Sequence, residues 1–184
     1  MKVNNINELR NQLSVRSKNG LPFLLAATFI WLIILIIFST PLDIIRKNLF
    51  TFYTTGLMFP LSIFISKIIK ADWNTNDNPL GKLGLYLNLA QLMYFPILFW
   101  AFSKNPEYMI IFFSVITGAH FFPYGWFYNT KAYFIIAPII SITVMLLGWN
   151  IININLWQIP LVMIFLLIIL SSWLYLDYKK KTTI

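Results

Sequence analysis

Seven polar side chains within the apolar stretches of this 184-residue chain are of types that bind small molecules. His120 is the only histidine, and because an imidazole ordinarily titrates near neutral pH it can relay a proton or orient a ligand. Amide and hydroxyl groups both donate and accept hydrogen bonds, so they can hold a polar ligand beside it. The predicted ligand-binding residues are His120, Asn88, Gln91, Ser62, Thr117, Tyr94 and Tyr124.

Helical spacing groups several of these residues on common faces. Three stripes follow spacings of three, four and seven residues: Thr55, Phe59, Ser62 and Ser66; Gly84, Asn88, Gln91 and Phe95; Ser114, Thr117, Gly118 and Phe121. At about 1.5 Å of rise per residue, Ser62, Asn88 and His120 lie roughly 10 Å from the same end of their helices. One interpretation is dry packing, in which small and hydroxyl residues let helices approach closely. The other is a cavity open to the cytoplasm, with Asn88 or Gln91 as the partner of His120.

Catalytic, metal and cofactor sites are not predicted. The chain has no cysteine and no second histidine, and its six acidic residues fall in tails, loops or helix ends. The loop DWNTND begins like a calcium-binding loop, but Asp77 stands where glycine is needed and Leu83 where glutamate is needed. The simpler interpretation is a polar turn in which Asn78 caps the next helix, with Pro79 at its first position.

The elements that must position these side chains are membrane helices. Hydrophobic residues make up 59% of the chain and charged residues only 11%, and the mean hydropathy is +0.72. A soluble chain of this size could not cover so much apolar surface with so few charges. A bilayer core needs about 20 apolar residues as helix, and this length predicts spans at about 21–38, 49–69, 83–102, 108–127, 132–149 and 156–176.

The predicted fold is therefore all-α: an integral membrane bundle of six transmembrane helices over residues 20–177. A basic leader (1–19), with a short amphipathic helix, precedes it, and a basic tail (178–184) follows. The leader is alternatively a disordered basic segment. Since its polar part is long and no small-residue cleavage site follows the first apolar run, an uncleaved helix is favoured over a secretion signal.

The lysines and arginines orient the bundle. Eleven of the fourteen fall in segments that share one side with the N-terminus, which predicts a cell-membrane protein with both termini in the cytoplasm. The same bias explains the net charge of +8 through contact with anionic lipid headgroups rather than nucleic acid. The aromatic residues Tyr124, Trp126, Tyr128 and Tyr133, near Lys131, are typical of anchors at a membrane interface.

Reporter fusions test this orientation directly. We expect fusions after residues 76, 129 and 184 to report the cytoplasmic side, and fusions after residues 45, 105 and 153 to report the opposite side. A reproducible cytoplasmic signal after residue 105 would contradict the six-span order.

The run ELRNQLSVRSKNGLPFLLAATFIWLI resembles the start of a group of small, uncharacterised, polytopic bacterial membrane proteins. The resemblance extends over most of the chain but implies no activity and transfers no functional residue. Three classes of function stay open: a small-molecule permease or binding protein with a polar cavity, an accessory, regulatory or immunity protein that acts through helix contacts, and a membrane-embedded enzyme. The last is least favoured because no acid or base stands beside His120 in sequence. Expected partners are the lipid bilayer, a small-molecule ligand and a second copy of the chain.

Overall fold

The structure is a computed structural model that describes residues 6–73, 75, 77–150 and 155–183. Residues 1–5 of the predicted leader and the fusion site at residue 153 lie outside the described residues. All regular structure in the described part is helical, which confirms the predicted all-α fold. The helices are α1 (Ile6–Arg16), η1 (Lys18–Gly20), α2 (Leu21–Ser39), α3 (Ile44–Thr55), α4 (Met58–Ile69), α5 (Gly81–Ala90), η2 (Gln91–Tyr94), α6 (Phe95–Lys104), α7 (Pro106–Phe127), α8 (Lys131–Asn150) and α9 (Gln158–Thr182).

Five of these helical stretches are long and apolar enough to cross a membrane. They cover Lys18–Ser39, Gly81–Lys104, Pro106–Phe127, Lys131–Asn150 and Gln158–Thr182. The sixth candidate is the pair α3 and α4, which meets at an angle of 44° and crosses if the pair forms one bent span. With this pair counted as one span, the described helices give the six predicted crossings.

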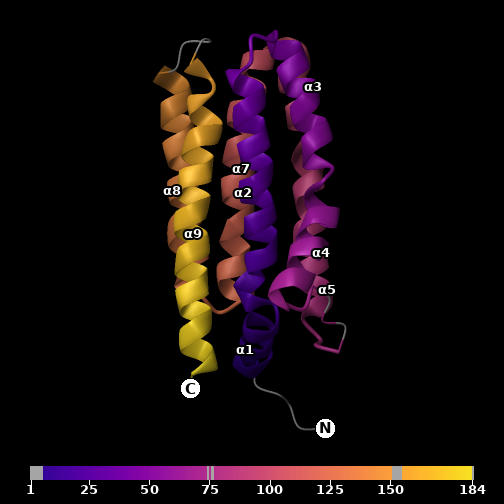
Figure 1. The fold of residues 1–184 in the computed structure, drawn as a ribbon, viewed down its shortest axis with the longest axis vertical. Helices are drawn as coiled ribbons and strands as arrows, with labels where there is room; N and C mark the ends of the chain where they lie inside the picture. Colours follow the sequence, from indigo (N-terminus) through magenta and orange to yellow (C-terminus); the bar gives the residue numbers. More distant parts are fainter. Residues whose placement is uncertain (1–5, 74, 76, 151–154, 184) are drawn as a thin grey trace.

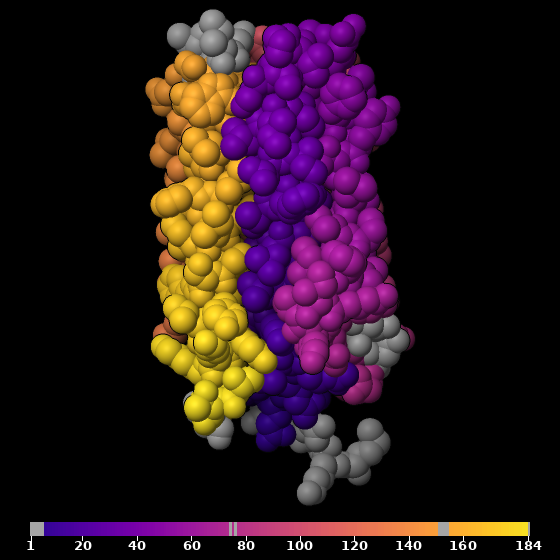
Figure 2. All heavy atoms as spheres, viewed as in Figure 1, coloured from indigo at the N-terminus to yellow at the C-terminus, as the bar shows by residue number. Residues whose placement is uncertain are grey.

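The helices run up and down side by side, with α1 at the end of the bundle where α9 finishes (Figure 1). Figure 2 shows α2 between α9 on one side and α4 on the other, in agreement with its packing contacts. The main buried core comes from α2, α7, α8 and α9, together with Leu13 of α1. The described residues of α3 to α6 contribute only partly buried side chains to it. The bundle thus has a tightly packed side and a looser side.

Local signals set several helix ends. Pro22 lies in the first turn of α2, where its missing N–H costs nothing, and it follows Gly20 at φ 76°. The Asp43 carboxylate accepts a hydrogen bond from the Arg46 backbone N–H and caps α3. The predicted cap at Asn78 is wrong, because its side-chain oxygen accepts from Leu80 N–H and α5 begins only at Gly81. Asn78 instead closes a turn and donates its amide to the Leu9 carbonyl of α1.

The leader helix α1 is tied to the bundle rather than lying free on a leaflet. Leu13 is 1% exposed, and Arg10 donates to the Trp126 carbonyl at the end of α7. Arg16 holds the segment between α4 and α5, with its Nη1 2.6 Å from Asp77 Oδ2 and its Nε 2.8 Å from Asp72 Oδ2. The α1 helix therefore connects the ends of α4, α5 and α7, and we call this set of contacts the strap.

Acid should loosen this strap. The hydrogen bond from Arg16 lowers the pKa of Asp77, so the stabilisation is complete above the unfolded value near 3.8 and is lost as pH falls through the lower folded value. We expect a spin label on Gln12→Cys, in a chain with no other cysteine, to become more mobile only below about pH 4. Asp77→Asn should raise the label's mobility part of the way already at neutral pH, because Asp72 still holds Arg16. The matched Asp43→Asn change, at the start of α3, should leave the label unaffected, and equal effects of both would contradict the strap.

Candidate functional site

The second span is interrupted in its middle. The α3 helix ends at Thr55, α4 begins at Met58, and the two helix axes differ by 44°. In a continuous helix the Gly56 carbonyl would accept from the N–H of residue 60, but Pro60 has none. The Thr55 hydroxyl turns back to the Phe52 carbonyl at 2.7 Å. The break therefore leaves the Gly56 carbonyl without its usual helical donor.

The third span is also interrupted. Between α5 and α6 the backbone tightens into the 3₁₀ segment η2, from Gln91 to Tyr94. Pro96 explains the change. In an α-helix the Leu92 carbonyl would accept from the N–H of residue 96, and proline has no N–H. The Phe95 N–H donates to the Leu92 carbonyl instead. Irregular backbone at membrane depth occurs where it is buried in protein or lines a cavity.

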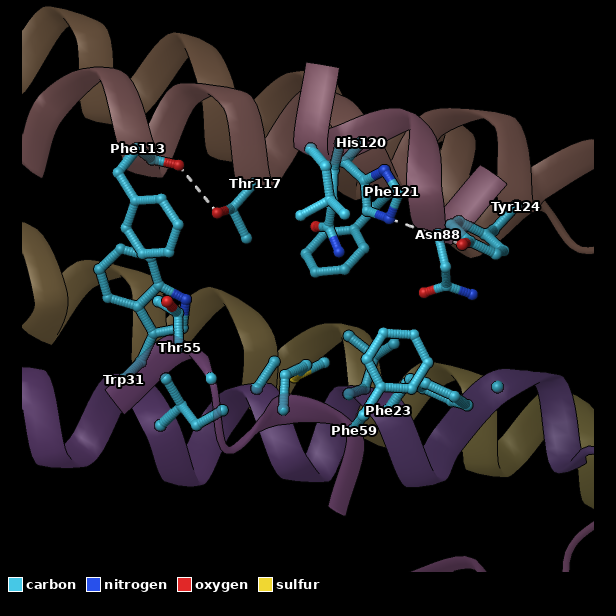
Figure 3. Close-up of a pocket in the computed structure, with 18 of the residues that line it drawn as sticks. Phe23, Trp31, Thr55, Phe59, Asn88, Phe113, Thr117, His120, Phe121 and Tyr124 are labelled. Atoms are coloured by element: carbon cyan, nitrogen blue, oxygen red, sulfur yellow. Dashed lines mark hydrogen bonds between the residues drawn. The ribbon is translucent and has the colours of Figure 1, made fainter. Parts of the chain in front are cut away.

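Both interruptions line one cavity of about 380 Å³. Its walls come from α2, the α3–α4 break, α5 with η2, α7 and the start of α8, and ten of its 22 lining residues are aromatic. The aromatic members are Phe23, Trp31, Phe52, Phe59, Phe95, Phe113, Phe121, Tyr124, Tyr128 and Tyr133. Figure 3 shows Phe23, Trp31 and Phe59 on one side of the cavity and Phe113, Thr117 and His120 on the other. The volume is in the range of small-molecule sites.

Neutral polar groups interrupt these aromatic walls: Thr55, Asn88, Gln91, Thr117 and His120. The Asn88 amide donates to the Gly84 carbonyl at 3.0 Å, which leaves its oxygen free to accept. The Thr117 hydroxyl donates to the Phe113 carbonyl at 2.8 Å and keeps its acceptor capacity. Among the described residues, the Gln91 side chain makes no hydrogen bond, and its amide can serve a ligand as donor and acceptor.

His120 contacts a tyrosine rather than an amide. Its Nε2 lies 3.5 Å from the Tyr124 hydroxyl, a long contact between side chains one turn apart on α7. The predicted partners Asn88 and Gln91 line the same cavity but make no direct hydrogen bond to the imidazole in the described structure. The lining residues include no Asp, Glu, Lys or Arg, and the described residues hold no metal-ligand cluster. The site as described therefore offers hydrogen-bonding groups, with the His120–Tyr124 contact among them.

Five of the seven predicted site residues line the cavity: His120, Asn88, Gln91, Thr117 and Tyr124. Ser62 does not, because it is fully buried elsewhere on α4 and donates to the Phe59 carbonyl at 2.9 Å. Tyr94 does not either, since its side chain is 47% exposed and Phe95 takes the lining position. The expected polar cavity is in fact mainly apolar, with aromatic residues as its largest group.

The tyrosines taken as interface anchors form the cavity's end wall instead. Tyr124, Tyr128 and Tyr133 are each less than 9% exposed, and the Tyr124 and Tyr128 rings stack with centroids 5.9 Å apart. Only Trp126 of that group is well exposed, at 40%, with Arg10 over its ring. Gly20 completes this wall, and a Cβ on it would meet a Tyr128 ring carbon at 2.7 Å. The anchor interpretation is therefore wrong for the three tyrosines.

A partly buried polar cluster, which the sequence did not reveal, closes the bundle beyond this wall. The Lys181 ammonium lies 2.9 Å from Asp177 Oδ2 and donates to Ser14 Oγ at 2.9 Å. It also donates to the carbonyls of Tyr128 and Asn129 at 3.0 and 2.9 Å. The D-x-x-x-K spacing on α9 was the available signal, since residues four apart share a helix face.

Fold and cavity together define an all-α membrane bundle with an intramembrane cavity at two interrupted spans. The profile of a family of unknown function, DUF7010, matches residues 6–177, and the chain belongs to this family. No match was found among curated proteins or among solved structures.

Proposed function

We propose that the protein binds a small molecule within the membrane and acts as a permease or binding protein for it. The observation that carries the proposal is that the interruptions of two neighbouring spans, at Gly56 and at η2, line the same cavity. Transporters use interrupted helices in this way, because the freed backbone groups and nearby side chains hold the substrate near the middle of the bilayer. Pro60 and Pro96 explain each break locally, but helix packing alone gives no reason for both breaks to face the same cavity.

The proposed cavity faces the cytoplasmic half of the bilayer. Its end wall, at Gly20, Tyr128 and Tyr133, lies at the end of the bundle that carries α1 and the basic C-terminal part of α9. The distribution of lysines and arginines supports a cytoplasmic position for that end, where anionic headgroups would meet the basic residues. An accessory protein acting through helix contacts alone would not need this space.

Thiol labelling of single cysteines tests whether the cavity is real and reachable, because the chain has no native cysteine. Thr117→Cys lies in the cavity, and the matched control Thr28→Cys replaces another threonine that bonds back to the carbonyl four residues earlier but does not line it. We expect N-ethylmaleimide to modify residue 117 at least about tenfold faster than residue 28 in membranes, because residue 117 lines the cavity and residue 28 does not. Equally slow modification of both would show dry packing and favour the accessory class.

A further inference from the structure

The lining of the cavity excludes a charged ligand. All its polar groups are neutral hydroxyls, amides, one imidazole or backbone, and no lysine, arginine, aspartate or glutamate lines it. A charge inside a membrane is costly unless a partner of opposite sign or water compensates it. A ligand carrying a carboxylate, phosphate or ammonium would find no such side chain here.

The aromatic side chains favour a flat apolar body. Phe23 and Phe59 meet edge to face with centroids 6.2 Å apart, and Trp31 stacks on Phe113 at 5.2 Å. These two pairs come from α2, α4 and α7 and present ring faces and edges along the cavity (Figure 3). Rings and unsaturated chains gain offset or edge-to-face contacts against such surfaces.

The free hydrogen-bonding capacity is concentrated on α5 and η2, facing α7. The Asn88 oxygen accepts, the Gln91 amide does both, and the His120 ring adds one more neutral group from α7. These groups make up only a small part of the lining. They therefore suit a ligand that has one polar head on a larger apolar body. A hydroxyl or a carbonyl fits this combination of donors and acceptors without charge.

The cavity opens toward the lipid between α4 and α5. The α4 helix packs on α2 and α5 packs on α7, and the two make at most a marginal contact with one another. Phe59 of α4 and Leu92 of η2 both line the cavity yet are 40% and 44% exposed. A molecule dissolved in the bilayer therefore reaches the polar groups without crossing the end walls.

We infer that the ligand is an uncharged, lipid-soluble molecule with a flat or unsaturated apolar body and one hydroxyl or carbonyl head, taken up from the bilayer. This inference rests on the proposed function, because it assigns a ligand class to the same cavity. Head recognition falls to Asn88, Gln91 and His120, and the aromatic residues hold the body.

Three pyrene probes of one shape and different charge test the class: pyrenemethanol, pyrenecarboxylate and pyrenemethylammonium. Each is titrated at neutral pH into the full chain in lipid nanodiscs, with empty nanodiscs as background and energy transfer from tryptophan as the signal. We expect saturable binding of pyrenemethanol, with both charged probes at least about tenfold weaker. Trp31→Phe should reduce the transfer signal, since Trp31 lines the cavity.

Cavity filling separates this site from general partition into lipid. Thr117→Phe should abolish the saturable signal, whereas Thr28→Phe, its matched control outside the cavity, should retain it. Equal binding of all three probes, lost in Thr117→Phe, would overturn the ligand class and leave the proposed function intact. Absence of saturable binding by any probe, while residue 117 still reacts with maleimide, would also overturn the class alone. Absence of both binding and labelling would overturn the proposed function as well.

Discussion

Replacing Lys181 with methionine should destabilise the protein by about 3 kcal/mol, because it removes one member of a partly buried, multiply hydrogen-bonded ion pair. The methionine keeps most of the length but leaves the Asp177 carboxylate and the Tyr128 and Asn129 carbonyls without their common donor. The estimate takes the low end of the range for such changes, since the Lys181 and Asp177 side chains keep 20% and 27% exposure. Thermal unfolding in detergent should show a decrease in Tm of about 6–12 °C.

The neighbouring lysine provides the control. Lys180 lies on the same turn of α9 with the same chemistry, but its side chain is exposed. Lys180→Met should change stability by less than about 0.5 kcal/mol, as surface substitutions usually do. Adding Asp177→Asn to Lys181→Met should recover part of the loss, because the stranded carboxylate is then gone. Equal loss in both lysine variants would mean that the tail acts through its net charge rather than through this cluster.

The three terminal lysines also show where sequence information stops. Their composition predicts a basic tail after residue 177. The α9 helix instead continues to Thr182 and partly buries one of the three lysines, Lys181. Which lysine points inward depends on α1, whose Ser14 accepts from Lys181 across 167 residues of sequence. Local periodicity carries no information about such a distant contact, so only the folded chain reveals it.

The spans themselves could be predicted because lipid imposes a length on each apolar run. The stripes on the third and fourth spans were useful for a similar reason. Asn88 and Gln91 stay on one face because η2 begins only at Gln91, and regular helix keeps Thr117 beside His120. The stripe on the second span failed within α4, because the cavity ends near Phe59 and does not reach the next turns of that helix. Thr55 and Phe59 line the cavity, whereas Ser62 and Ser66 are buried away from it.

The aromatic lining was missed because aromatic residues near span ends have two roles in membrane proteins. Tyr128 and Tyr133 stand beside Trp126 and Lys131, a composition typical of interface belts. Their burial follows from α1 and η1, which cover this end of the bundle, and from the Tyr133 hydroxyl, which donates to the Asn19 carbonyl at 2.8 Å. Local composition identifies the sequence neighbours of these tyrosines, but it does not predict which distant segments pack over them.

The close contact between α7 and α8 fixes the cavity wall that carries His120. A Cβ on Gly118 would lie 2.7 Å from Ile140 Cγ2 and from Ser141 Oγ, and 3.0 Å from the Ser141 backbone nitrogen. Ser141 in turn donates its hydroxyl to the Val115 carbonyl of α7 at 3.1 Å. The small-residue stripe on α7 therefore serves both interpretations, since Gly118 packs against α8 while Thr117 lines the cavity.

Replacing Gly118 with valine should cost about 3 kcal/mol or more, the upper end of the range for overpacking, because the backbone of Ser141 cannot move aside as a side chain can. The helices would have to separate, which forfeits the close approach that small residues allow in a membrane. The neighbouring Ala119 is exposed on the same helix, and Ala119→Val should cost less than about 0.5 kcal/mol. Thermal unfolding and size-exclusion profiles of the two variants decide the matter, since both add a branched side chain to α7. If Gly118→Val matched Ala119→Val in both measurements, α7 and α8 would not approach as closely as described, and the wall that holds Thr117 and His120 in the cavity would lack its support.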